Sequence, residues 1–269
     1  MSAALRGRSR RAVFLGYHSV TEDGPPYLSL TPDTFERQLD LLSRKGFRSG
    51  NFEDLRRLAA GARLPGRRAF LTFDDGFRDT VTTAMPMMAE RGYAGMAFVL
   101  PRHLDEGAPL DWPEVAGEAG RRPGLMRSID WGMAEQLVEA GWEIGSHGLT
   151  HARLTGLGDE ALRQELLDSR RLIAERLGGC EMLAYPFGAW DARVAEAAAA
   201  AGYAFAFTLP FGEQSRATPL SIPRVTIDDR DRAWRFRAKL SRSGRSALFS
   251  PLRPIARRAL RRRPHSHAE

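Results

Sequence analysis

The feature that most constrains the fold of this chain is the alternation of short apolar segments with amphipathic helical segments. The segments typical of buried strands are 12–17, 69–73, 94–100, 142–144, 182–185, 203–209 and 221–227. The segments with helical periodicity or helix-start residues are 31–46, 51–61, 77–90, 130–141, 159–177, 191–201 and 229–240. About seven strand–helix units in one series predict a closed or nearly closed parallel barrel. We therefore expect an α/β fold of the distorted (β/α)7 type, with a doubly wound open sheet as the alternative.

Charge is distributed unevenly along the 269 residues. The net charge is +7, but residues 232–269 hold twelve Lys/Arg and a single acid, Glu269, so this part carries +11 and residues 1–231 carry −4. A strongly basic terminal segment is typically a tail that lies on a surface or in solvent. We expect a basic extension at 1–11, one barrel domain at 12–228, and a basic helix with a flexible tail at 229–269.

Cysteine content and hydropathy limit the compartment and the partners. The one cysteine, Cys180, excludes an internal disulfide bond and a thiolate metal cluster. The apolar run 12–15 is too short for a signal sequence or a membrane span, so we expect a protein that is cytoplasmic or peripheral on a membrane. Apolar residues among the arginines after Pro254 predict a short amphipathic helix that contacts anionic lipid, with a solvated tail as the alternative. No motif for specific nucleic-acid recognition accompanies the basic residues.

Two adjacent carboxylates follow the apolar segment 69–73. Asp74 and Asp75 stand before Gly76, where the strand ends and a helical pattern begins. The carboxyl ends of barrel strands are where α/β folds place their chemistry. Because neighbouring acids repel, such a pair is costly unless a positive group lies between them, and a metal ion is the simplest candidate. The alternative is a loop aspartate beside a helix-capping aspartate.

A pair of histidines follows another strand end. His147 and His151 are four residues apart, a spacing that would place both imidazoles on one face of a helical turn. Two surface histidines are the alternative. Together with Asp75 they would form a set of two imidazoles and one carboxylate, which leaves coordination positions open for water and substrate. An open position is typical of a catalytic metal site rather than a structural one.

These motifs resemble those of the NodB-like polysaccharide deacetylases. The resemblance rests on Thr72-Phe73-Asp74-Asp75-Gly76, His147-Gly148-Leu149-Thr150-His151 and Tyr185-Pro186-Phe187-Gly188, in this order, and extends over about 12–228. It implies a distorted (β/α) barrel and a divalent metal, commonly Zn²⁺, with Co²⁺, Ni²⁺ or Fe²⁺ as alternatives. It also implies hydrolysis of N-acetyl groups on amino sugars, with an N-acetylated glycan or a lipid-linked sugar as substrate.

The resemblance also implies roles for individual residues. Asp75, His147 and His151 would hold the metal, and Asp74 would be the base that activates a metal-bound water. The backbone N–H of Phe187 would stabilise the oxyanion. Further substrate contacts would come from the same motif and from aromatic residues that can stack on sugars: Tyr185, Pro186, Gly188, Trp190 and Trp112. For Tyr185, core packing is the favoured alternative.

Two departures from the family pattern change the expected site. A late Leu-x-His segment, which would supply the general acid, is absent, and Ala184 stands where an arginine that supports the base is expected. His18, which follows the first strand, is the replacement acid that we expect, because imidazole has a suitable intrinsic pKa. This arrangement resembles the branch of the family that acts on poly-N-acetylglucosamine-type polymers. A hydrogen-bonded structural histidine is the alternative. Trp112 lies in a Gly/Pro-rich connector, 101–128, that we cannot place, and His103 is expected on the surface.

Other functions fit the same residues. An O-deacetylase, or another hydrolase of small acyl groups, would use the same metal chemistry. A catalytically degenerate relative that only binds glycan is favoured by Ala184 and by the missing late histidine. The intact pairs of aspartates and histidines argue against degeneracy.

Overall fold

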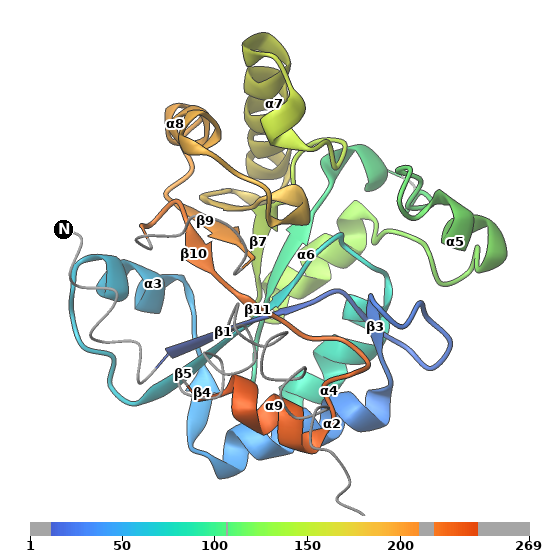
Figure 1. Ribbon diagram of the computed structural model, residues 1–269, viewed down its shortest axis with the longest axis vertical. Helices are drawn as coiled ribbons and strands as arrows, with labels where there is room; N and C mark the ends of the chain where they lie inside the picture. Colours follow the sequence, from blue (N-terminus) through green and yellow to red (C-terminus); the bar gives the residue numbers. More distant parts are fainter. Residues whose placement is uncertain (1–11, 106, 210–217, 242–269) are drawn as a thin grey trace, which may run out of the picture.

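The computed structural model describes residues 12–105, 107–209 and 218–241, and these are built around a nine-stranded sheet (Figure 1). All of its strand pairs are parallel, in the order β10-β9-β8-β7-β6-β5-β1-β11, with β4 paired to β5 beside this path. The strands are β1 Ala12–Tyr17, β4 Phe47–Ser49, β5 Arg67–Phe73, β6 Met96–Val99, β7 Glu143–Ser146, β8 Met182–Ala184, β9 Phe205–Thr208, β10 Ile222–Pro223 and β11 Val225–Thr226. A separate pair is formed by β2 Ser19–Val20 and β3 Ser29–Leu30.

One short segment joins the two ends of the sheet. Ile222 of β10 pairs with Phe207 of β9, and Val225 of β11 pairs with Leu15 of β1. Only Arg224 separates the two short strands, so a continuous piece of chain bridges the ends. Together with β1, β5, β6, β7, β8 and β9, this piece makes the barrel nearly closed. The predicted distorted (β/α)7 barrel is confirmed, and the open doubly wound sheet is excluded.

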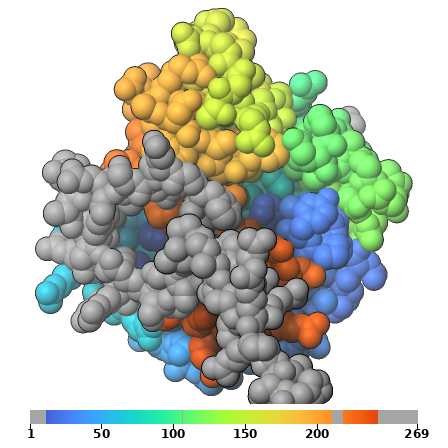
Figure 2. All heavy atoms as spheres, in the orientation of Figure 1, coloured from blue at the N-terminus to red at the C-terminus, as the bar shows by residue number. Residues whose placement is uncertain are grey.

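The helices surround the barrel. They are α2 Pro32–Arg44, α3 Phe52–Ala59, α4 Met85–Ala89, α5 Ala116–Arg121, α6 Trp131–Glu139, α7 Asp159–Leu177, α8 Ala192–Ala200 and α9 Ala233–Lys239. The predicted starts at Thr31, Asn51 and Asp130 are confirmed, because each side chain accepts a hydrogen bond from the backbone N–H three residues later. Figures 1 and 2 show α7 and α8 packed together at one end of the molecule.

The predicted helix at 77–90 is not continuous. A π-helical turn, η1 Thr80–Ala84, precedes the short α4. Pro86 has no N–H to donate and its ring crowds the preceding turn, so a regular α-helical hydrogen-bond ladder cannot run through this segment. The wider turn accommodates the proline.

Two layers of buried side chains stabilise the barrel. Inside it, Phe70, Phe98 and Phe207 form one cluster, with the centroids of the Phe98 and Phe207 rings 5.2 Å apart. Outside it, Leu71 and Phe73 join the larger cluster beneath the helices. Burying one such side chain contributes about 1.5–3 kcal/mol. Side chains along β5 therefore alternate between the inside and the outside of the barrel. The residues that follow β5 lie at the barrel mouth, where the strand ends.

The connector 101–128 forms a substructure on the flank of the barrel. It contains a 3-10 turn, η2 Pro101–His103, and α5, which Figure 1 shows at the edge of the molecule. Its apolar residues Leu110, Trp112, Val115 and Met126 are buried with Phe77 and Leu100 of the barrel in a third cluster.

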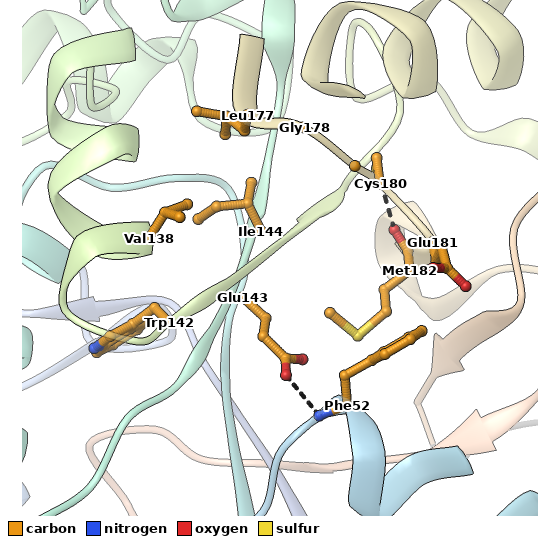
Figure 3. A pocket seen from close by; sticks show the side chains of 11 residues that line it. Phe52, Val138, Trp142, Glu143, Ile144, Leu177, Gly178, Cys180, Glu181 and Met182 are labelled. Atoms are coloured by element: carbon orange, nitrogen blue, oxygen red, sulfur yellow. Dashed lines mark hydrogen bonds between the residues drawn. The ribbon is translucent and has the colours of Figure 1, made fainter. Parts of the chain in front are cut away.

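A cavity lies at the opposite end of the barrel, where β7 and β8 begin. Its volume is about 320 Å³, and Figure 3 shows Glu143 within it, accepting a hydrogen bond from the backbone N–H of Phe52 at 2.6 Å. The cavity includes none of the residues predicted to act in catalysis. The expectations for 1–11 and for the tail at 242–269 lie outside the described residues. Within the described ranges, no helix is both long and apolar enough to cross a membrane.

Candidate active site

The two aspartates lie at the end of β5, as predicted, and diverge from one another. The backbone N–H of Asp74 donates to the Tyr17 carbonyl at 2.9 Å, which continues the pairing between β5 and β1. Asp75 then takes a left-handed conformation with φ 70°, followed by Gly76 with φ 67°. Among the described residues, only Asp75, His151 and Phe187 have positive φ without being glycine. Such costly conformations gather at functional sites.

His147 and His151 meet Asp75, but not on a helical turn. The Nε2 atoms of His147 and His151 lie 3.2 Å and 3.4 Å from Asp75 Oδ1. The chain between the histidines is an irregular loop with φ 83° at Gly148 and φ 64° at His151, so the prediction of a helical turn is wrong. The spacing still brings the imidazoles together, because left-handed residues turn the loop back on itself.

Glu165 of α7 holds this loop, and sequence reasoning missed it. Its Oε2 accepts hydrogen bonds from the backbone N–H groups of Leu149 at 2.7 Å and Thr150 at 3.2 Å, and the Thr150 hydroxyl donates to its other oxygen. A helix would have directed those N–H groups along its own axis. A buried glutamate on the apolar side of an otherwise amphipathic helix is the signal that could have identified it.

Asp75, His147 and His151 fit a cation. Their ligand atoms all lie within 4.8 Å of one another. The Nδ1–H of His147 donates to the Ala184 carbonyl at 2.8 Å, so the Nε2 of the neutral ring presents a lone pair to Asp75. Asp75 Oδ1 is buried and has no hydrogen-bond partner in the described part of the chain. Two imidazole nitrogens and one carboxylate oxygen that converge in this way are suited to a metal ion.

The pKa values agree with this interpretation. Burial raises the pKa of Asp75, but the imidazoles of His147 and His151 outweigh burial and hold it well below its ordinary value. Burial lowers the pKa of His151, which favours the neutral form that a ligand needs. Burial also lowers the pKa of His147, but the carboxylates of Asp74 and Asp75 face the ring and outweigh burial. The pKa of His147 therefore lies above its ordinary value. The same negative field attracts a divalent cation.

Arg224 supports Asp74, in place of the arginine that the family pattern has at position 184. Its Nη1 and Nη2 donate to the two carboxylate oxygens of Asp74, each at 2.6 Å, and Nη1 also donates to Thr72 Oγ1 at 2.8 Å. Burial raises the pKa of Asp74, but Arg224 and His147 outweigh it, so the pKa lies below its ordinary value. The expectation of an unsupported base is therefore wrong. An arginine inside the apolar segment 221–227 is the signal that sequence reasoning overlooked.

His18 lies at the same mouth. It follows β1 directly, and because Tyr17 of β1 pairs with Phe73 of β5, His18 and Asp74 lie after neighbouring strand ends. Its Nδ1 is buried and has no hydrogen-bond partner among the described residues. Asp79 fixes the chain after it, accepting hydrogen bonds from Ser19 Oγ at 2.6 Å and from the Val20 N–H at 2.9 Å.

The third motif forms a tight turn, η4 Pro186–Gly188, beside His151. Phe187 has φ 60°, and its N–H has no hydrogen-bond partner in the described part of the chain. Tyr185 is fully buried, its hydroxyl donates to the Leu220 carbonyl at 2.9 Å, and its ring pairs with Trp190 at 6.3 Å. Tyr185 therefore belongs to the core, as its alternative interpretation held, and direct stacking of its ring on a sugar is excluded in this conformation. Trp190 is partly buried against the same core.

Two residues of the connector differ from expectation. His103 is 6% exposed, and its Nε2 lies 3.0 Å from Asp111 Oδ1, so the prediction of a surface histidine is wrong. Trp112, which could not be placed from sequence, stacks on the His151 ring with 4.2 Å between centroids. Because the connector has no regular periodicity, its approach to the site depends on tertiary packing.

Comparison with known proteins identifies the family. A model of the family described as polysaccharide deacetylase matches residues 61–206. A Bacillus subtilis (strain 168) protein named as a candidate polysaccharide deacetylase, YxkH, is 22% identical over 204 residues, which cover 75% of this chain and 66% of that protein. The chain thus spans slightly less than two thirds of that relative.

Solved structures share the fold. The Streptococcus pyogenes deacetylase PplD, solved in complex with acetate, matches with a TM-score of 0.71 and 20% identity over 86% of this chain and 98% of that one. A de-N-acetylase from Aggregatibacter actinomycetemcomitans matches with a TM-score of 0.64 and 17% identity over 81% and 95%. The family match covers more than half of the sequence, and the chain therefore belongs to the polysaccharide deacetylase family.

Proposed function

We propose that this protein is a metal-dependent hydrolase that removes acetyl groups from the N-acetylated amino sugars of a glycan. The observation that carries the proposal is the convergence of Asp75, His147 and His151 beside the buried Asp74–Arg224 pair. An N-acetylated substrate is supported by the family match and by the de-N-acetylase that shares the fold. A poly-N-acetylglucosamine-type polymer is the substrate class that the sequence resemblance favours.

Asp75, His147 and His151 would hold the metal, with Zn²⁺ the first choice for two nitrogens and one oxygen and Co²⁺, Ni²⁺ or Fe²⁺ as alternatives. A divalent ion bound there would supply Lewis acidity to the acyl group and make a water molecule acidic near neutral pH. The chain's own contribution is the geometry. Asp75 and His151 sit in strained left-handed conformations and His147 is fixed through Ala184, so the ligands are preorganised.

Asp74 acts as the general base. Arg224 holds both of its carboxylate oxygens and keeps it ionised, so it can accept a proton from the attacking water at neutral pH. The bidentate contact also fixes the plane of the carboxylate. Arg224 itself is 1% exposed and does not reach solvent, so it acts through Asp74.

Two further groups complete the reaction. The Phe187 N–H, left without a partner by the turn at η4, donates to the carbonyl oxygen as negative charge develops on it. His18, close to both aspartates, delivers a proton to the leaving amine nitrogen. The presence of base, ligands, N–H donor and acid at one barrel mouth argues against a catalytically degenerate relative.

The test joins metal analysis to acetate release. Purified protein should contain a divalent metal and release acetate from N-acetylglucosamine oligomers, and Asp75→Ala should lose both. Asp33→Ala, which removes a carboxylate whose side chain is 78% exposed on α2, is the matched control and should keep both. Acetate release from O-acetylated but not N-acetylated sugars would replace the N-deacetylase proposal with the ester alternative. Full activity in Asp75→Ala would refute the metal site.

A further inference from the structure

The His151 ring lacks the orienting hydrogen bond that metal-ligating histidines ordinarily make. Such a histidine usually donates its second N–H to a carbonyl or carboxylate, which fixes the ring plane. His147 follows this rule, with Nδ1 donating to the Ala184 carbonyl. The His151 Nδ1 is buried and has no partner in the described part of the chain, and the backbone at His151 is itself strained, with φ 64°. Something else must hold this ring.

Two aromatic rings enclose it. Trp112 stacks on the imidazole, with centroids 4.2 Å apart and 23° between planes. Phe187 meets the imidazole edge-on at 4.6 Å and 71°, and Arg153 covers the Phe187 ring at 4.3 Å. Aromatic pairs of this geometry are attractive beyond the area that they bury. The imidazole can therefore rotate only by displacing Trp112 or Phe187.

The connector holds Trp112 in place. His103, bonded to Asp111, packs its ring edge-on to Trp112 at 6.1 Å. The indole is 6% exposed and belongs to the third apolar cluster. Two backbone hydrogen bonds close the connector on itself, from Leu110 N–H to the Met126 carbonyl at 3.0 Å and from Ser128 N–H to the Ala108 carbonyl at 2.9 Å. The insertion thus carries one rigid indole to a metal ligand.

We propose that Trp112 and Phe187 are positioning residues that fix the His151 ring, Trp112 by stacking and Phe187 by edge-on packing, in place of the missing hydrogen bond. The connector thereby sets how tightly the site retains its metal. The proposal rests on the proposed function only in requiring that a divalent ion binds at Asp75, His147 and His151. Its test measures Zn²⁺ affinity, which does not depend on turnover.

Zn²⁺ affinity of the full chain is measured by competition with a chromophoric chelator. Trp112→Leu should weaken binding about 10–100-fold, the cost of losing an orienting contact to a ligand. Trp112→Phe retains a stacking ring and should stay within about threefold of the unmodified protein. Trp131→Leu is the matched control: Trp131 is 8% exposed, with its indole N–H bonded to Asp105, so its loss should lower stability and spare Zn²⁺ affinity.

Phe187→Leu keeps the backbone N–H and provides an independent variant if Trp112→Leu does not fold. Its affinity should also fall. Unchanged affinity in a folded Trp112→Leu or Phe187→Leu variant overturns the positioning role and leaves the proposed function intact. Failure of the unmodified protein to bind Zn²⁺ overturns both.

A second, independent observation concerns the outer face of α9. Trp234 is 67% exposed, more than any other large apolar side chain among the described residues. Arg232 immediately precedes this short helix and Arg237 lies on it, and in the described ranges no carboxylate pairs with either. A groove of about 520 Å³ separates α9 from α2, which lie side by side in Figure 1, and Arg37 and Arg44 of α2 line its other wall.

The charges on this face favour a negative partner. Asp231, the buried acid at the start of α9, is already engaged by Lys239 at 2.6 Å and Arg235 at 3.0 Å. Arg37 and Arg44 have only long, exposed pairs on their own helix, at 3.7 Å and 4.0 Å. The sequence after α9, 242–269, adds eight arginines and one acid. Arginines around an exposed tryptophan are typical of a surface that contacts lipid headgroups.

We infer that α9 and the facing edge of α2 bind the surface of a bilayer that contains anionic phospholipid. The full chain is sedimented with vesicles of phosphatidylcholine alone or mixed with phosphatidylglycerol. It should bind the mixed vesicles only, and Arg232→Gln/Arg237→Gln should bind about 25-fold more weakly, a factor of about five for each arginine. Val138→Ser, which alters an exposed apolar residue of α6, should bind normally. Equal sedimentation of the arginine variant and the unmodified protein, or no binding to mixed vesicles, overturns the inference.

Discussion

Removing Arg224 should destabilise the folded protein more than any other single loss of charge near the site. The guanidinium makes two 2.6 Å contacts to Asp74 and one 2.8 Å contact to Thr72, and Arg224 and Asp74 are 1% and 4% exposed. Arg224→Met fills much of the same space but leaves the Asp74 carboxylate buried and unpaired. Breaking a buried ion pair in this way costs about 3–5 kcal/mol. We expect the free energy of unfolding to fall by that amount.

A double-mutant cycle separates the charge from the packing. Asp74→Asn combined with Arg224→Met removes both charges, so the double variant should recover about half of the stability lost by Arg224→Met alone. Arg37→Met is the control, because the side chains of Arg37 and Asp33 are 64% and 78% exposed and their pair should contribute less than about 1 kcal/mol.

Urea unfolding of the metal-free proteins, followed by circular dichroism, gives all four values. A loss below about 1 kcal/mol in Arg224→Met would show that the buried pair has another source of compensation. Absence of recovery in the double variant would show that packing around Arg224, rather than the stranded carboxylate, sets the cost. Either result would refute the electrostatic account.

Three further predictions follow from the same contacts. Arg224 lowers the pKa of Asp74, and Arg224→Lys loses the bidentate contact. The acid limb of the pH profile of kcat/KM should therefore move to higher pH, and an unmoved limb would contradict the role of Asp74 as the base. Burial raises the pKa of Asp79 from 3.8 to about 6, so its stabilising effect is complete below the unfolded value and is lost as pH rises through 6. The full pKa difference between the folded and unfolded states corresponds to about 3 kcal/mol. Because the side chain is partly exposed, we expect Asp79→Asn to raise the free energy of unfolding by about 1–2 kcal/mol at about pH 8. At about pH 4 the urea unfolding of the two proteins should be almost the same. Glu165→Gln replaces one acceptor of the His147–His151 loop with a donor, and it should lower unfolding free energy by about 1–2 kcal/mol and weaken Zn²⁺ binding in the chelator assay, whereas a purely structural role would change only the first.

The barrel and the candidate metal-binding set of Asp75, His147 and His151 could be predicted, because both depend on local sequence patterns. Each strand is a short apolar segment; the pair Asp74–Asp75 comes directly after β5, and His147 comes directly after β7. In a parallel barrel the carboxyl ends of strands meet at one mouth, so local positions are enough to bring these side chains together. The prediction of a helical turn at 147–151 was wrong because this segment does not depend on local sequence alone. Its conformation is set by Glu165, in a different element, which captures the loop's backbone N–H groups.

Trp112 shows where local patterns end. Nothing in a Gly/Pro-rich connector indicates that its tryptophan reaches a histidine 39 positions later, because the contact depends on how the third apolar cluster folds against the barrel. The same holds for His103, whose polarity suggested the surface but which is buried, with its Nε2 bonded to Asp111. Both positions depend on tertiary packing that the local sequence of the connector does not indicate.

Arg224 joins closure of the barrel to the chemistry at its mouth. It is the one residue between β10, which pairs with β9, and β11, which pairs with β1, so the register that closes the barrel also determines where its guanidinium lies. The arginine thus reaches Asp74 from the junction of β10 and β11, 150 positions later in the sequence, rather than from position 184. An arginine introduced by Ala184→Arg would enter a fully buried position beside the Phe98–Phe207 cluster, so we expect it to destabilise the barrel rather than replace Arg224. Rescue of Arg224→Met by Ala184→Arg, measured as recovered unfolding free energy and acetate release, would show that the two positions are interchangeable and that closure of the barrel does not determine the choice.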